Sequence, residues 1–155
     1  MKRLLFTLAT CCVMCACEQK TEMNPFFTEF QTEYGAPDFT KIRLEHYEPA
    51  FLKGIEEQNA EIKAIVDNPE EPTFENTIVA LDKSGGILAR VSGVFFALTE
   101  ADTNDSLTAL NEKMAPVLSE HSDNIYLNQD LYKRVADVHQ QEKDCLLYTS
   151  DAADE

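Results

Sequence analysis

The apolar positions in the middle of the chain recur at the period of an α-helix. The first such stripe consists of Phe51, Ile55, Ile62 and Ile65. We expect Pro49 in the first turn of this helix, because a proline there sacrifices no intrahelical hydrogen bond. Two prolines within residues 68–72 end it, since neither can continue a helix.

A second helix is predicted from Thr73, which can cap its first turn while Glu75 complements the helix dipole. Its stripe comprises Ile78, Leu81, Leu88, Val91, Phe95 and Leu98. Gly85 and Gly86 interrupt the pattern at a cost of about 1 kcal/mol each relative to alanine. Because Gly85 lies on the stripe, we expect a tight helix crossing there, with a kink as the alternative.

Two further helices follow. The third is expected over residues 105–122, with an apolar face and with Pro116 bending it, and Asp123-Asn124 should end it. Asn128 is a possible cap for the fourth. The inward positions are Leu107, Leu110, Met114 and Leu118 in the third helix, and Leu131, Val135 and Val138 in the fourth. With no alternating strand pattern and no repeat of 20–50 residues, the sequence predicts an all-α fold.

The segment from Asn24 to Thr40 has aromatic residues and turn formers in place of a helical stripe. The aromatic positions are Phe26, Phe27, Phe30, Tyr34 and Phe39. We expect an extended arm that packs its rings onto another surface.

Residues 1–16 have the pattern of a signal peptide. Lys2 and Arg3 precede an uncharged run from Leu4 to Ala16, which is shorter than the roughly 20 residues of a membrane-spanning helix. The sequence Met-Cys-Ala-Cys at residues 14–17 fits a lipoprotein cleavage site, at which Cys17 would be acylated and become the new N-terminus. Residues 17–23 would then form a lipid-anchored tether, which predicts a location in the bacterial cell envelope, lipid-anchored or periplasmic.

Two alternatives exist for this segment. Its four cysteines, Cys11, Cys12, Cys15 and Cys17, could form a metal or disulfide cluster. The apolar surroundings and the absence of histidine or acidic partners disfavour that cluster. Ordinary secretion, with cleavage nearby and no lipid, is the second alternative.

Residues 145–155 resemble the translation of a sequencing adapter. The DNA string TGTCTCTTATACACATCT encodes Cys-Leu-Leu-Tyr-Thr-Ser, the sequence found at residues 145–150. We therefore expect the natural reading frame to have been lost near Asp144 and exclude these residues from fold reasoning. The alternative is a genuine polar C-terminus.

The net charge of the chain excludes some classes of binding partner. The formal net charge is −15, from 13 basic and 28 acidic residues. Binding to nucleic acid needs a basic face that displaces counterions from phosphates, so a nucleic-acid partner is not expected. The lack of a Lys/Arg cluster also disfavours a polybasic membrane patch.

The sequence contains few residues that could form a catalytic or metal site. The three histidines, His46, His121 and His139, are far apart, and no H-E-x-x-H, cysteine pair, phosphate loop or nucleophile elbow is present. We expect His121 to be a hydrogen-bonded structural histidine on the inward face of the third helix, and the other two to lie at the surface. The glutamates at 56, 57, 61, 70 and 71 are expected to be solvated. No catalytic or metal-ligating residue is assigned.

Residues 24 to about 139 nevertheless resemble the N-terminal part of bacterial peptidyl-dipeptidases of the Dcp type, within the thimet-oligopeptidase-like zinc metallopeptidases. The Asn-Thr-Ile and Thr-Asn-Asp stretches favour the Dcp branch over oligopeptidase A. The matching stretches are Asn24-Pro25-Phe26-Phe27, Tyr47-Glu48-Pro49-Ala50-Phe51, Gly54, Ala60-Glu61-Ile62, Ala64-Ile65, Asn68-Pro69, Pro72-Thr73-Phe74-Glu75-Asn76-Thr77-Ile78, Ser84-Gly85, Arg90-Val91, Val94-Phe95-Phe96, Thr103-Asn104-Asp105 and Asp123-Asn124-Ile125-Tyr126-Leu127-Asn128.

The resemblance implies a helical enzyme with a deep channel, a zinc ion bound by an H-E-x-x-H helix, and short peptides as substrates that lose C-terminal dipeptides. None of those catalytic residues lies in this chain, so residues 24–144 would form only an N-terminal helical wall and would be inactive alone. The alternative function is a small helical envelope lipoprotein that binds a partner.

Overall fold

The computed structural model describes residues 23–151, and it describes side chains for residues 23–143. Within this range the all-α prediction is confirmed, since the range contains helices and turns but no strand. The elements are η1 (Pro25–Phe27), η2 (Glu33–Gly35), α1 (Leu44–Val66), η3 (Phe74–Val79), α2 (Ala80–Lys83), α3 (Gly86–Ala101), α4 (Asp105–Tyr126) and α5 (Gln129–Asp151).

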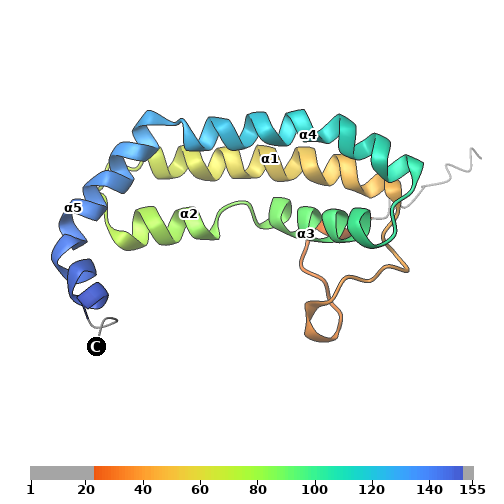
Figure 1. Cartoon of the computed structure of the whole chain (residues 1–155), viewed down its shortest axis with the longest axis horizontal. Helices are drawn as coiled ribbons and strands as arrows, with labels where there is room; N and C mark the ends of the chain where they lie inside the picture. Colours follow the sequence, from red (N-terminus) through yellow and green to blue (C-terminus); the bar gives the residue numbers. More distant parts are fainter. Residues whose placement is uncertain (1–22, 152–155) are drawn as a thin grey trace, which may run out of the picture.

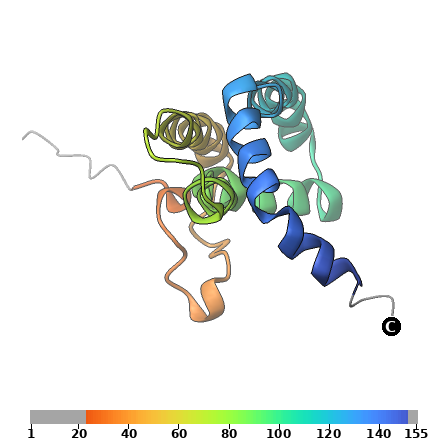
Figure 2. The same cartoon turned by 90° about the vertical axis from the view of Figure 1, so that its left-hand side faces the viewer.

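The long helices α1 and α4 lie side by side, and α2 and α3 follow one another along the opposite side of α1 (Figure 1). At one end α5 turns away from α4 and crosses past α1 and η3, as Figure 2 shows. The segment before α1 loops out beneath α3 at the other end. None of the helices in the described range combines the length and the apolar run that a membrane span requires.

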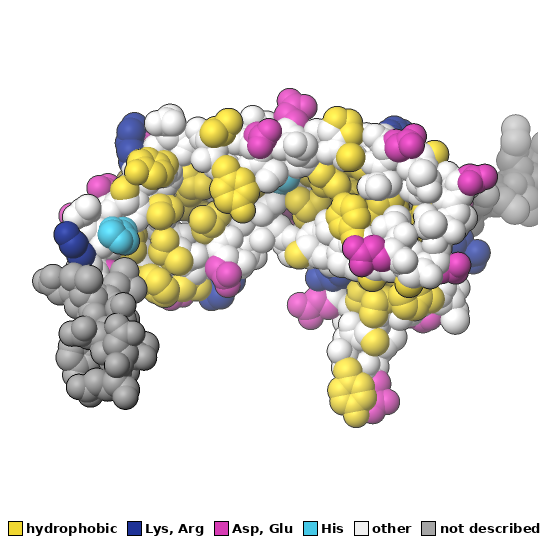
Figure 3. Space-filling model, in the orientation of Figure 1, with side chains coloured by type: hydrophobic (Ala, Val, Ile, Leu, Met, Phe, Trp, Pro, Cys, Tyr) yellow, Lys and Arg dark blue, Asp and Glu magenta, His cyan; other side chains and the backbone are white. Residues whose placement is uncertain are grey.

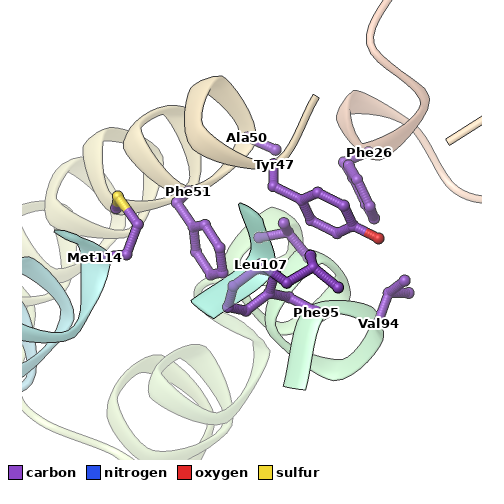
Figure 4. Packing of buried hydrophobic residues seen from close by; sticks show 9 residues of the cluster. Phe26, Tyr47, Ala50, Phe51, Val94, Phe95, Leu107 and Met114 are labelled. Atoms are coloured by element: carbon purple, nitrogen blue, oxygen red, sulfur yellow. The ribbon is translucent and has the colours of Figure 1, made fainter. Parts of the chain in front are cut away.

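The main hydrophobic core lies between α1, α3 and α4, and four of its nine buried side chains are aromatic (Figure 4). The ring centroid of Phe95 lies 5.3 Å from those of both Tyr47 and Phe51. Phe26 of the arm is fully buried against Tyr47, with 5.2 Å between ring centroids. The predicted packing of the arm is therefore confirmed for Phe26, whereas Tyr34 at the tip is 95% exposed.

A second, smaller cluster joins the C-terminal end of α1 to the N-terminal end of α5. Its buried members are Ile62, Ile65 and Leu131, with Leu81 and Ile125 packed against them. Beside it, Arg134 of α5 donates hydrogen bonds to the backbone oxygens of Asn68 and Glu70 and to the side chain of Asn76. The loop after α1 is thereby attached to α5.

The first helix begins earlier than predicted. Pro49 is the sixth residue of α1, not a first-turn residue. The cause is a cap that the apolar stripe does not reveal, because the Arg43 backbone N–H donates to Nδ1 of His46 and fixes the start at Leu44. The predicted end at the two prolines is confirmed.

The second predicted helix is in fact two helices. Thr73 caps it as expected, accepting a hydrogen bond from the Asn76 N–H, but the first turns are π-helical and α2 ends at Lys83. Gly85 then adopts a left-handed conformation with φ of 76°, which only glycine adopts without strain, and α3 starts at Gly86. The stripe continues because α2 and α3 both face α1.

The third predicted helix also differs in length. It continues through Asp123-Asn124 to Tyr126, four residues beyond the predicted end, because the C-terminal carbonyls are satisfied by Leu127 and Asn128 backbone N–H groups. Asn128 caps α5 as predicted, since its side chain accepts from the N–H groups of Asp130 and Leu131. The predicted signal peptide and the predicted lipidation site Cys17 lie outside the described residues.

Candidate functional site

An open groove of about 650 Å³ lies between the two hydrophobic clusters, and we call it the inter-cluster groove. On this face hydrophobic side chains gather where the end of α4 and α5 approach α2 (Figure 3). All five α-helices and the turn before α5 line it. The lining residues are Gln58, Leu81, Leu88, Ser92, Phe96, Leu118, His121, Ser122, Ile125, Tyr126, Asn128, Leu131, Tyr132 and Val135.

Two changes in the direction of the chain create this groove. The break at Ser84-Gly85 separates α2 from α3, so the two helices cannot form one continuous ridge against α1. The cap at Asn128 then redirects the chain from α4 into α5, which crosses at one end instead of continuing the bundle. Three aromatic side chains remain exposed along the groove, with Phe96 at 39%, Tyr132 at 67% and Tyr126 at 84%.

A polar pair forms part of the lining where α1 faces α4. Nε2 of His121 lies 2.8 Å from Oε1 of Gln58, and the Gln58 amide nitrogen lies 3.2 Å from the Ser84 hydroxyl. Gly85 leaves room for this amide, since a Cβ at residue 85 would come within 2.6 Å of it. The Gly85 N–H donates to Oε2 of Glu61, so the break is attached to α1 at two points.

The hydrogen-bond directions determine the tautomer of His121. The Ser84 hydroxyl donates to the Leu81 carbonyl at 2.8 Å and therefore accepts from the Gln58 amide. Oε1 of Gln58 consequently faces His121 and requires a donor, which places the proton on Nε2. Nδ1 is buried and has no protein partner. Burial lowers the pKa of His121 below its ordinary value, because a charged ring would lose its hydration.

This histidine predicts a pH dependence of stability. Because the folded-state pKa of His121 is lower than that of the unfolded chain, only the unfolded chain gains a proton just below pH 6.5. The free energy of unfolding should therefore be highest above that pH and should decrease as the pH falls from 7.5 to 5.5. Urea denaturation at several pH values measures this change.

The matched variants for that measurement are His121→Gln and His139→Gln. His139 is exposed on α5, so its replacement should leave the pH slope unchanged. The His121→Gln chain should show a flatter dependence. An equal slope in all three proteins would contradict the assignment to His121.

The three histidines differ in their environment in the structure. His121 is a buried, hydrogen-bonded structural histidine, as predicted. His139 is at the surface, also as predicted, whereas His46 is half-buried and caps α1. Sequence reasoning missed Gln58, since a single polar residue on a helix gives no signal until its partner across the interface is known.

No group of three or more His, Cys, Asp and Glu residues within the described part of the chain is arranged to hold a metal ion. A zinc site of the kind the resemblance implies needs three such ligands, so the residues present do not fit zinc. The inter-cluster groove can instead bury an apolar surface, since nine of its 14 lining residues are aliphatic or aromatic.

Comparison with curated proteins identifies relatives over most of the chain. The chain is 48% identical over 120 residues to the dipeptidyl carboxypeptidase of Escherichia coli strain K12, and 46% identical over 118 residues to that of Salmonella typhimurium strain LT2. These matches cover 77% and 76% of this chain. Oligopeptidase A of E. coli is 28% identical over 115 residues. No protein-family model matches the chain.

The matches cover most of this chain but only a small part of each relative. This chain spans 18% of the E. coli dipeptidyl carboxypeptidase, 17% of the Salmonella protein and 16% of oligopeptidase A. The higher identity to the two carboxypeptidases agrees with the branch that the sequence motifs favoured.

Proposed function

Because this chain is homologous to a segment of the dipeptidyl carboxypeptidases, we propose that it forms the N-terminal helical part of a peptidase of that kind. The observation that carries the proposal is the 48% identity over 120 residues. The same relationship favours a peptidase segment over an independent partner-binding lipoprotein. The proposed substrates are short peptides, from which the whole enzyme would release C-terminal dipeptides.

In this proposal the chain supplies structure and not chemistry. Its described residues pack two hydrophobic clusters but offer no ligand set for zinc. The match covers 18% of the E. coli dipeptidyl carboxypeptidase. In a whole enzyme of that length, the metal and the groups that act on the peptide bond would belong to the other 82%. This chain alone should therefore release no dipeptides.

A segment exchange tests the proposal. Residues 24–143 of this chain replace the matching segment of the E. coli dipeptidyl carboxypeptidase, and dipeptide release from a short synthetic peptide is measured. We expect the chimera to retain activity, whereas deletion of the segment should abolish it. A folded chimera without activity would contradict the proposed function.

We also propose that the protein is attached to a membrane of the bacterial envelope through Cys17. Support comes from the uncharged run before this residue and the small residue Ala16 at the cleavage position. Two acyl signals give stable anchoring where one gives only reversible binding, so a multiply acylated cysteine would hold the chain despite its negative charge.

Metabolic labelling with a fatty-acid analogue in a bacterial host measures this modification. The chain without substitutions and a Cys15→Ala control should incorporate the label and sediment with membranes. The Cys17→Ala chain should lose both the label and the membrane association. Label retained by Cys17→Ala would argue against lipidation at this cysteine.

A further inference from the structure

We infer that the inter-cluster groove is the docking surface for an apolar, uncharged segment from the remainder of the peptidase polypeptide. This inference rests on the proposed function and adds to it by naming one surface of this chain and its occupant.

The groove differs in charge from the rest of the chain. Charged residues make up 26% of the sequence, yet none of the 14 lining residues is Lys, Arg, Asp or Glu. His121, the remaining candidate for a charge, is buried, and this burial lowers its pKa and so disfavours the charged ring. An ion or a charged side chain entering the groove would lose hydration without gaining an opposite charge.

Several apolar side chains along the groove are exposed. Tyr126 and Tyr132 project from the last turn of α4 and the first turn of α5, and Leu127 between them is 73% exposed. Aromatic residues clustered at a concave surface are typical of protein interfaces. Their continuity with Leu88 and Leu118, which are half-buried in the main cluster, would extend that core into the docked segment.

The length of the relatives supports an occupant from the same polypeptide. Because this chain matches only 18% of the E. coli protein, most of that polypeptide is available to cover the groove. A free peptide with a C-terminal carboxylate fits less well, since the lining offers no cation to bind it. A second copy of this chain would add another net charge of −15 and so oppose association.

Photocrosslinking in the chimera described above tests the inference. A photoreactive phenylalanine analogue replaces Tyr132 in one protein and Tyr34, at the distant tip of the arm, in the other. We expect Tyr132 to crosslink to peptides from the E. coli part of the same polypeptide, identified by mass spectrometry, at least tenfold more than Tyr34. Crosslinks to added peptide substrate, to a second copy, or at equal yield from both positions would overturn the inference.

A pair of charge substitutions provides a second measurement. In the 155-residue chain, Tyr132→Glu should leave the urea midpoint unchanged, because the side chain is 67% exposed. In the chimera the same change should shorten the half-life of activity on heating at least tenfold, while Tyr34→Glu should not. An inactive parent chimera would contradict the proposed function, whereas an active chimera indifferent to Tyr132→Glu would contradict only this inference.

Discussion

Replacing Gly54 with alanine is expected to destabilise the protein by about 3 kcal/mol, near the upper end of the cost of overpacking a close contact. Gly54 lies where α1 crosses α3, and a Cβ there would come within 2.8 Å of the backbone nitrogen of Leu88 and 2.9 Å of its Cα. Backbone atoms cannot rotate away as a side chain can, so the two helices would have to separate. Urea denaturation of the purified chain measures the change.

Gly93→Ala is the matched control for this experiment. Gly93 is in the middle of α3, and a Cβ there would meet nothing within 4 Å. Alanine has the higher helix propensity, so Gly93→Ala should stabilise the protein by up to about 1 kcal/mol. Equal effects at the two positions would show that propensity, and not the crossing at Leu88, determines the result.

The contrast between Gly54 and Gly85 shows what sequence reasoning could reach in this fold. The apolar stripes predicted the helices, and Thr73 and Asn128 were identified as caps because capping depends on residues within one turn. A tight crossing was expected at Gly85, but a Cβ there would meet the Gln58 side chain, whereas at Gly54 it would meet the backbone of Leu88. Which glycine faces a neighbouring backbone depends on helix packing, which local sequence does not encode.

The break at Ser84-Gly85 was expected only as the alternative of a kink, for a related reason. Leu81 and Leu88 are seven residues apart and both face inward, so the stripe continues through the break as though the helix did. The helix is broken by contacts with a distant part of the sequence. The Gly85 N–H donates a hydrogen bond to Glu61 of α1, and the Gln58 side chain of α1 fills the space beside Gly85. The same applies to the inter-cluster groove, whose lining residues come from segments far apart in sequence.

Removing the Phe95 ring tests the main core directly, and Phe95→Ala should cost about 3–5 kcal/mol of unfolding free energy. Phe95 is fully buried, and its ring contacts those of Tyr47 and Phe51 edge-on, so truncation would leave a cavity between α1 and α3 that these rings could fill only in part. Phe96→Ala is the control, because that ring is 39% exposed and should cost less than half as much. Urea denaturation and thermal melting of both variants make the comparison. If Phe96→Ala proved the more damaging, the core would be centred on the other face of α3, toward the inter-cluster groove.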